Sequence, residues 1–245
     1  MDGAAVEQLV NLSRNPRELG GFLYHPKDWI VSDPAALVQA GPLAKTLAVS
    51  TLGAVRDYLT GNRDQITLSG VSVHVVSPAC VQVLGPLDGR ARVRETFLSA
   101  ATADLTDGFL GKFMALEDLL VGLQVRFADV DDRKRVLGLL SNVKHETVKT
   151  ALDDGMTQVV QAKAGVALIS DVAVPNPITL SAFRTFRDIL QPSSLYVLRV
   201  QSGRLGGLPE VGLFEADGGA WKLTVISKIH DWLTEALPAG TAILA

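Results

Sequence analysis

The feature that most constrains the fold is an alternation of apolar and polar residues between residues 66 and 100. Val71, Val73 and Val75 alternate with Ser72 and other neighbours, and the same period returns after residue 80. Successive side chains of a β-strand point to opposite faces, so a period of two predicts strands with one buried face. We therefore predict a long hairpin or three-stranded meander over residues 66–100. Its exposed side is expected to carry three arginines, Arg90, Arg92 and Arg94.

The segments on either side of this meander have helical periodicity. Residues 43–59 carry apolar residues close to helical spacing and end at Gly61-Asn62, which predicts a helix with a C-terminal cap. Helical signals also dominate residues 107–154, where an acidic run at Asp129–Asp132 precedes the second of two amphipathic stripes. We predict a central helical segment there.

Residues 155–245 are predicted to form a mixed β/α unit. A hairpin turning at Ala164-Gly165 comes first, and Leu195–Val200 is a strand. The chain then runs through a strand over 211–216, a turn, a strand over 220–225, a helix over 226–237 and a short strand over 241–244. The whole chain therefore belongs to the α+β class.

Composition limits the remaining choices. The 245 residues are 47% hydrophobic and 20% charged with a net charge of −3, which suits a globular protein with a full core. No linker divides the chain, so residues 1–245 are interpreted as a single domain. The single cysteine, Cys80, lies in an alternating apolar run and is expected to be a buried small hydrophobe, not a metal ligand or reactive thiol. The N-terminus has no signal-peptide pattern and no apolar run approaches the roughly 20 residues of a membrane span. We expect a cytoplasmic protein without a membrane partner.

Residues 1–42 are interpreted as an extended arm. A short helix is predicted over residues 4–12, and the glycine and proline residues that follow it are expected to prevent further regular structure. Three aromatic residues lie in this segment, Phe22, Tyr24 and Trp29. An arm with aromatic anchors packs against its own domain or against a neighbour. The aromatic residues, together with Arg90, Arg92 and Arg94, are therefore candidate contacts between subunits.

No phosphate loop, dinucleotide fingerprint, nucleophile elbow or zinc-protease pattern occurs, and we expect no cofactor and no metal. The segment F-R-T-F-R interleaves two aromatics with Arg184 and Arg187. One interpretation is contact with nucleic acid by stacking and phosphate binding. The other places the phenylalanines inward and the arginines outward, paired with acids.

The segment L-F-E-A-D-G-G-A-W-K-L offers a second constellation. Glu215 and Asp217 would share one face of a strand and would bind a divalent cation if a third carboxylate joined them. Alternatively, Asp217, Gly218 and Gly219 form a hairpin turn, with Lys222 paired to Glu215 across the ladder. The turn interpretation is favoured, with Trp221 at a strand position beside it.

From Asn176-Pro177 through L-S-A-F-R-T-F-R-D-I-L-Q-P-S-S-L-Y-V-L-R-V to L-F-E-A-D-G-G-A-W-K-L, the chain resembles the YfdQ-like family of uncharacterised tailed-phage and prophage proteins. The resemblance is clearest over residues 153–237 and implies a phage origin. Because that family has no established activity, it implies no catalytic residue. The order of elements alone is also similar to tailed-phage capsid proteins and encapsulin shells, in which an N-terminal arm and a long hairpin reach over neighbouring subunits.

Taken together, these features lead to the hypothesis of a non-enzymatic phage protein that assembles with itself, as a capsid-like or encapsulin-like shell with or without phage or host protein cargo. The first alternative is an early phage protein that associates with nucleic acid or modulates host replication through its arginines. The second is a metal-dependent enzyme built on Glu215 and Asp217.

Overall fold

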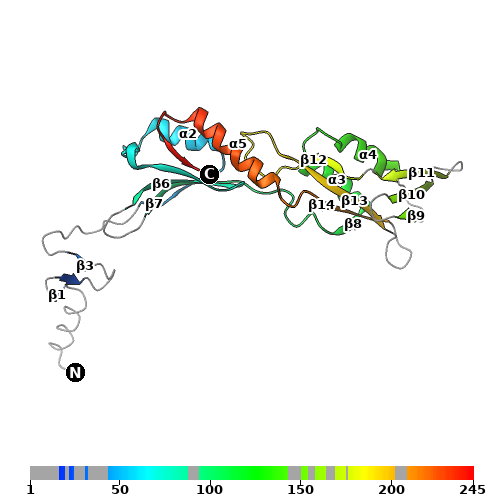
Figure 1. Cartoon of the computed structure of the whole chain (residues 1–245), viewed down its shortest axis with the longest axis horizontal. Coiled ribbons are helices and arrows are strands. Elements are labelled where there is room, and N and C mark those ends of the chain that lie inside the picture. Colours follow the sequence, from blue (N-terminus) through cyan, green and yellow to red (C-terminus); the bar gives the residue numbers. More distant parts are fainter. Residues whose placement is uncertain are drawn as a thin grey trace, which may run out of the picture.

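The structure is a computed structural model. It describes residues 44–87, 94–142, 150–153, 158–163, 169–174, 176–201 and 209–245, and three short strands near the N-terminus. Two larger sheets lie one after the other along the long axis of the molecule, and helices cover one face of each (Figure 1). The described residues form two hydrophobic cores, one under each pair of helices. The α+β class predicted from the sequence is confirmed.

The first sheet has five strands in the order β15-β5-β6-β7-β4. Its strands are β4 (Leu47–Val49), β5 (Ser72–Ser77), β6 (Cys80–Leu87), β7 (Arg94–Ala101) and β15 (Ala242–Leu244), and a short 3-10 turn (Leu68–Gly70) precedes β5. Antiparallel pairing of β5 with β6 and of β6 with β7 is the predicted meander. Every second residue of β5 and β6 is buried, as the alternation requires. Cys80, at the start of β6, is half-buried.

Two helices, α2 (Leu52–Gly61) and α5 (Trp221–Ala236), lie on one face of this sheet (Figure 1). The predicted helix over 43–59 is wrong in its first half, because residues Leu47–Val49 pair with β7 as strand β4. The helix begins after Thr51, whose hydroxyl oxygen accepts a hydrogen bond from the Ala54 amide at 3.2 Å. It ends at Asn62, which has a φ of 36° and donates its amide to Tyr58, so the predicted C-terminal cap is confirmed.

The second sheet has four antiparallel strands in the order β12-β13-β14-β8. Its strands are β8 (Phe113–Ala115), β12 (Ile178–Ser181), β13 (Ser193–Gln201) and β14 (Glu210–Glu215), and α3 (Leu116–Arg126) and α4 (Arg133–Asn142) pack with it in the second core. The helical prediction for residues 107–154 is thus correct for two helices. It is wrong at Phe113, which belongs to β8 and pairs with Gly212 of β14, and at Thr150–Asp153, which form a strand. Leu119 and Leu123 of α3 are fully buried, as their spacing predicts.

Two smaller sheets complete the described part of the chain. β9 (Thr150–Asp153), β10 (Gln158–Lys163) and β11 (Ile169–Val174) form an antiparallel sheet that contains the predicted hairpin. β1 (Arg17–Leu19), β2 (Phe22–Tyr24) and β3 (Val31–Ser32) form another in the segment interpreted as an arm. Phe22 and Tyr24 belong to β2, whereas Trp29, Arg90, Arg92 and the predicted helix over residues 4–12 lie outside the described residues. None of the described helices is long and apolar enough to cross a lipid bilayer.

The C-terminal prediction requires a correction. Residues 220–225 do not form a strand, because α5 already begins at Trp221. Trp221, Val225 and Ile229 are buried at intervals of four, so their burial in the first core needs a helical and not an extended backbone. The sequence D-G-G therefore joins a strand to a helix and does not close a hairpin.

Candidate functional site

The two cores meet at a loop, residues 182–192, that connects β12 to β13. β12 and β13 are neighbours in the four-stranded sheet, yet Phe186 of the loop is fully buried in the core of the five-stranded sheet. The loop therefore leaves one core, enters the other and returns. Thr185 donates its hydroxyl to the Pro78 carbonyl at 2.5 Å, which ties the loop to the turn between β5 and β6.

The side chain of Gln191 holds this loop in shape. Its Oε1 accepts from the amides of Arg184 at 3.1 Å and Thr185 at 3.3 Å, and its Nε2 donates to the Phe186 carbonyl at 3.0 Å. These bonds satisfy backbone groups that the loop itself leaves without partners. One amide side chain thus replaces the pairing that a strand or helix would provide.

Asp188 fixes the same loop to α2. Its carboxylate accepts hydrogen bonds from the amides of Leu52 at 3.2 Å and Gly53 at 3.0 Å. These are the first amides of the helix, which lack partners within it, and a negative charge there interacts favourably with the helix dipole. The N-terminus of α2 is therefore capped by a residue far away in the sequence as well as by Thr51.

Arg184 is the centre of the junction. Its side chain is 1% exposed, and Nη1 lies 2.5 Å from Oε1 of Glu215. Nη2 donates to the hydroxyl of Ser194, and the guanidinium lies 3.7 Å from the ring centroid of Trp221. A buried arginine is tolerated only where a negative charge compensates it and hydrogen-bond acceptors meet its N–H groups.

For Arg184, the outward position and the contact with nucleic acid are both wrong, because its side chain is buried, whereas the predicted pairing with an acid is confirmed by Glu215. Arg187 does lie outward, with its guanidinium 3.5 Å from the centroid of the Phe183 ring. Tyr196 packs within 5.9 Å of the Arg184 guanidinium, and burial raises the pKa of its hydroxyl above the ordinary value.

Glu215 and Asp217, the pair considered for a metal site, have separate contacts. Glu215 binds Arg184, so the predicted ion pair with Lys222 is wrong. Asp217 accepts from the Gly219 amide at 3.0 Å, and Gly218 and Gly219 have φ values of 61° and 81°, as the predicted turn chemistry requires. Within the described ranges, no group of three histidine, cysteine or acidic side chains is placed to hold a metal ion.

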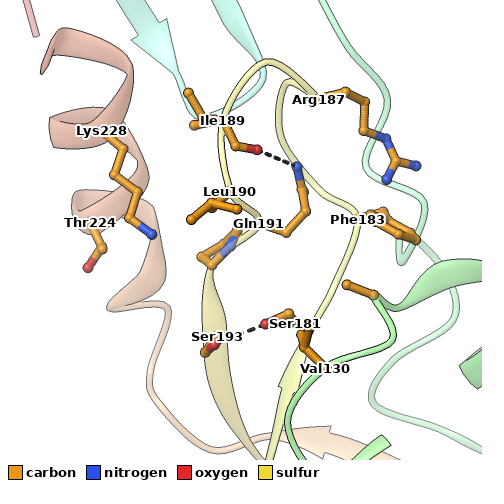
Figure 2. A pocket seen from close by; sticks show the side chains of 12 residues that line it. Val130, Ser181, Phe183, Arg187, Ile189, Leu190, Gln191, Ser193, Thr224 and Lys228 are labelled. Atoms are coloured by element: carbon orange, nitrogen blue, oxygen red, sulfur yellow. Dashed lines mark hydrogen bonds between the residues drawn. The ribbon is translucent and has the colours of Figure 1, made fainter. Parts of the chain in front are cut away.

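An open groove lies between the loop of residues 182–192, which we call the junction loop, and α5 (Figure 2). Its volume is about 660 Å³, and its surface is mainly apolar. Lys228 and Thr224 project from α5 on one side, while Phe183 and Arg187 stand on the other. The remaining lining residues are Ala128, Val130, Ser181, Ile189, Leu190, Gln191, Pro192 and Ser193.

Two properties of this groove indicate binding. Leu190 is 83% exposed at its edge, the largest exposure among the large hydrophobic side chains of the described residues. Arg187 and Lys228 form no ion pair with a carboxylate in the part of the chain that the structure describes. An apolar surface that carries two uncompensated positive charges suits a partner that is apolar and acidic.

Of the residues proposed from the sequence, the structure brings together Arg184, Glu215 and Trp221 in the junction, and Arg187 in the groove. Arg94 lies instead at the start of β7, where it donates to the Gly85 carbonyl at 3.3 Å. Leu190 and Lys228 were not singled out from the sequence. The available signals were a leucine directly before Q-P, where a turn is expected, and a lysine next to the apolar positions of the predicted helix.

Comparison with known proteins found no family model, no curated protein and no solved structure that matches this chain. The resemblance to the YfdQ-like family therefore stays a prediction.

Proposed function

We propose that this chain is a non-enzymatic structural protein that assembles with further copies of itself. The observation that carries the proposal is the open apolar groove beside the junction loop, with Leu190 exposed at its edge. Large exposed hydrophobic side chains around a groove cost free energy in water and mark surfaces that another protein covers. A phage origin, a place in the cytoplasm of the host and a capsid-like shell as the form of the assembly belong to the same proposal.

The outer face of the four-stranded sheet supports it further. Phe113 and Phe214 pack edge to face there, with ring centroids 5.5 Å apart, and Phe113 is 37% exposed. Both rings lie over Gly212, where an added Cβ would come within 2.6 Å of Phe214. Leu195, on the same face, is 42% exposed. A sheet with one face on a core and one in water normally has a polar outer face.

The two alternatives have less support. Arg184 does not support nucleic-acid binding, because it is buried against Trp221 and Glu215. Glu215 does not support a carboxylate enzyme, because it is paired with Arg184, and the Asp217 carboxylate is engaged in the turn before α5.

Light scattering coupled to size-exclusion chromatography tests the proposal on the full chain, whose monomer mass is 26.1 kDa. We expect a mass several times larger that falls on dilution. Leu190→Glu places a charge in the groove and should shift the mass toward the monomer. Leu244→Glu, at a leucine that is 55% exposed and outside the groove, should leave the mass unchanged. A wild-type protein that stays monomeric throughout the micromolar range contradicts the proposal.

A further inference from the structure

The outer face of α3 carries exposed apolar side chains among its polar ones. Leu119 and Leu123 bury its inner face in the second core. On the outer side, however, Val121 is 50% exposed and Val125 is 60% exposed. Residues three and four apart lie on the same face of a helix, so these two valines form an apolar strip that continues to Asp118.

The same stripe carries the negative charge of the helix. Glu117 and Asp118 occupy the first turn of α3, where acids interact favourably with the helix dipole. Both are exposed, and neither forms an ion pair with a basic side chain among the described residues. We call the four residues Glu117, Asp118, Val121 and Val125 the α3 stripe.

The α3 stripe and the groove are complementary in chemistry. The groove presents an apolar lining with Arg187 and Lys228, and the stripe presents two apolar side chains with two carboxylates. Lys112 and Arg126 line the same hollow as the stripe. Arg126 donates to the Leu105 carbonyl and lies over the Phe109 ring, so Lys112 is the basic side chain that stands beside the stripe. Two positive charges thus face two negative charges around a shared apolar contact. An amphipathic helix that lays an apolar face into a groove is a common mode of recognition between proteins.

The stripe has to meet the groove of a different molecule. The inner face of α3 is fixed by its two buried leucines, which hold the stripe toward solvent. We propose that the groove of one copy binds the α3 stripe of the next copy. This inference rests on the proposed self-assembly and names the surfaces that would produce it.

A contact between two different patches is heterologous. Where each added copy leaves one groove and one stripe free, the assembly grows head to tail until it closes as a ring or continues as a filament. A two-fold dimer through this contact requires the groove of each copy to bind the stripe of the other at the same time.

Charge reversal on each side tests the inference. We expect Arg187→Glu with Lys228→Glu to weaken association by at least about tenfold, because the reversed groove then faces the acids of the stripe. Glu117→Lys with Asp118→Lys should do the same from the other side. The control, Lys45→Glu with Arg63→Glu, reverses two exposed charges outside both patches and should leave association unchanged.

Mixing the two reversed proteins gives the decisive measurement. The groove variant has an acidic groove and an acidic stripe, and the stripe variant has a basic groove and a basic stripe. Opposite charges therefore meet only between the two variants, so the mixture should assemble to about the wild-type mass while each protein alone does not. A chain with all four reversals should assemble by itself again. Light scattering detects both outcomes, and circular dichroism checks that each variant is folded.

Failure of this inference differs from failure of the proposed function. If the wild type assembles but the reversals have no effect, or if mixing does not restore assembly, the groove-to-stripe contact is wrong and self-assembly stands. If the wild type is a monomer under every condition, both are wrong.

Discussion

The buried pair of Arg184 and Glu215 leads to a prediction about the sign of two substitutions. The guanidinium is 1% exposed, whereas the Glu215 side chain is 31% exposed. Removing the charge of Glu215 leaves a cation in the interior without its counter-charge, but removing Arg184 leaves a carboxylate that water can reach. The two halves of the ion pair are therefore unequal.

Glu215→Gln keeps the size of the side chain and an acceptor for Arg184 but removes the charge. Breaking a buried ion pair from one side costs about 3–5 kcal/mol, and the partial exposure of Glu215 favours the lower end, about 3 kcal/mol. Arg184→Met removes the cation–π contact with Trp221, about 2 kcal/mol, and its bond to Ser194, about 1 kcal/mol, but also ends the desolvation of the charge. A net loss of about 2 kcal/mol is expected.

The double variant is then expected to be more stable than Glu215→Gln alone. Once the arginine is gone, the partly exposed glutamine needs no counter-charge, so the double variant should lose only about 2 kcal/mol, as Arg184→Met does. The coupling energy between the two sites is about 3 kcal/mol under this reasoning.

Urea unfolding followed by circular dichroism and tryptophan fluorescence measures the three free energies of unfolding. Arg56→Met and Asp57→Asn provide the control, because that ion pair is 46% and 68% exposed and each change should stay within about 0.5 kcal/mol. The reasoning is refuted if Glu215→Gln is as stable as the wild type. It is also refuted if adding Arg184→Met lowers stability further.

Two further predictions concern the helices. Gly122→Ala in α3 should destabilise the protein by about 2 kcal/mol, because its Cβ would lie 2.2 Å from Phe109 Cζ. Gly138→Ala in α4 is the control, because nothing lies within 4 Å of the added Cβ. This control should be neutral or stabilising by up to about 1 kcal/mol in the same urea assay. Burial and a 2.9 Å hydrogen bond to Asp64 raise the pKa of Tyr58 to about 12 from 10.0. The stability from this shift is complete below pH 10 and is lost as pH rises toward 12. Asp64→Asn should lower that pKa, as measured by tyrosinate absorbance against a Tyr58→Phe blank, and an unchanged pKa would contradict the assignment.

The strand meander could be predicted from the sequence because its signal is local. Val73, Val75, Val81 and Val83 are buried on one face, and the period of two is sufficient to place them there. The turn at Asp217 was predictable for the same reason, since its geometry depends on adjacent glycines and one carboxylate.

The prediction for residues 220–225 failed because two periods fit a short segment. A run of six residues alternates well enough for a strand, whereas the buried residues Trp221, Val225, Ile229 and Leu233 repeat every four along sixteen residues of helix. A longer window would have favoured the helix. The first half of the predicted helix over 43–59 failed differently, because the pairing of β4 with β7 is a tertiary contact.

The position of Arg184 could not be predicted from its neighbours in the sequence. Its partners Ser194 and Glu215 are 10 and 31 residues away, and they lie on β13 and β14, whose pairing brings them to the same place. An arginine between two phenylalanines has the same local pattern whether it faces solvent or a buried carboxylate. The interior position is a consequence of the fold.

The junction loop links the buried ion pair to the exposed groove. Arg184 faces inward, and three residues later Arg187 faces outward, while Gln191 holds both ends of the segment between them. Leu190 and Arg187 therefore keep their places in the groove only while the inner side of the loop is anchored. Because Trp221 contacts Arg184 and begins the helix that carries Lys228, the second wall of the groove depends on the same contact. The proposed binding surface is thus built on the junction between the two cores, and the order of the junction sets the shape that a partner meets.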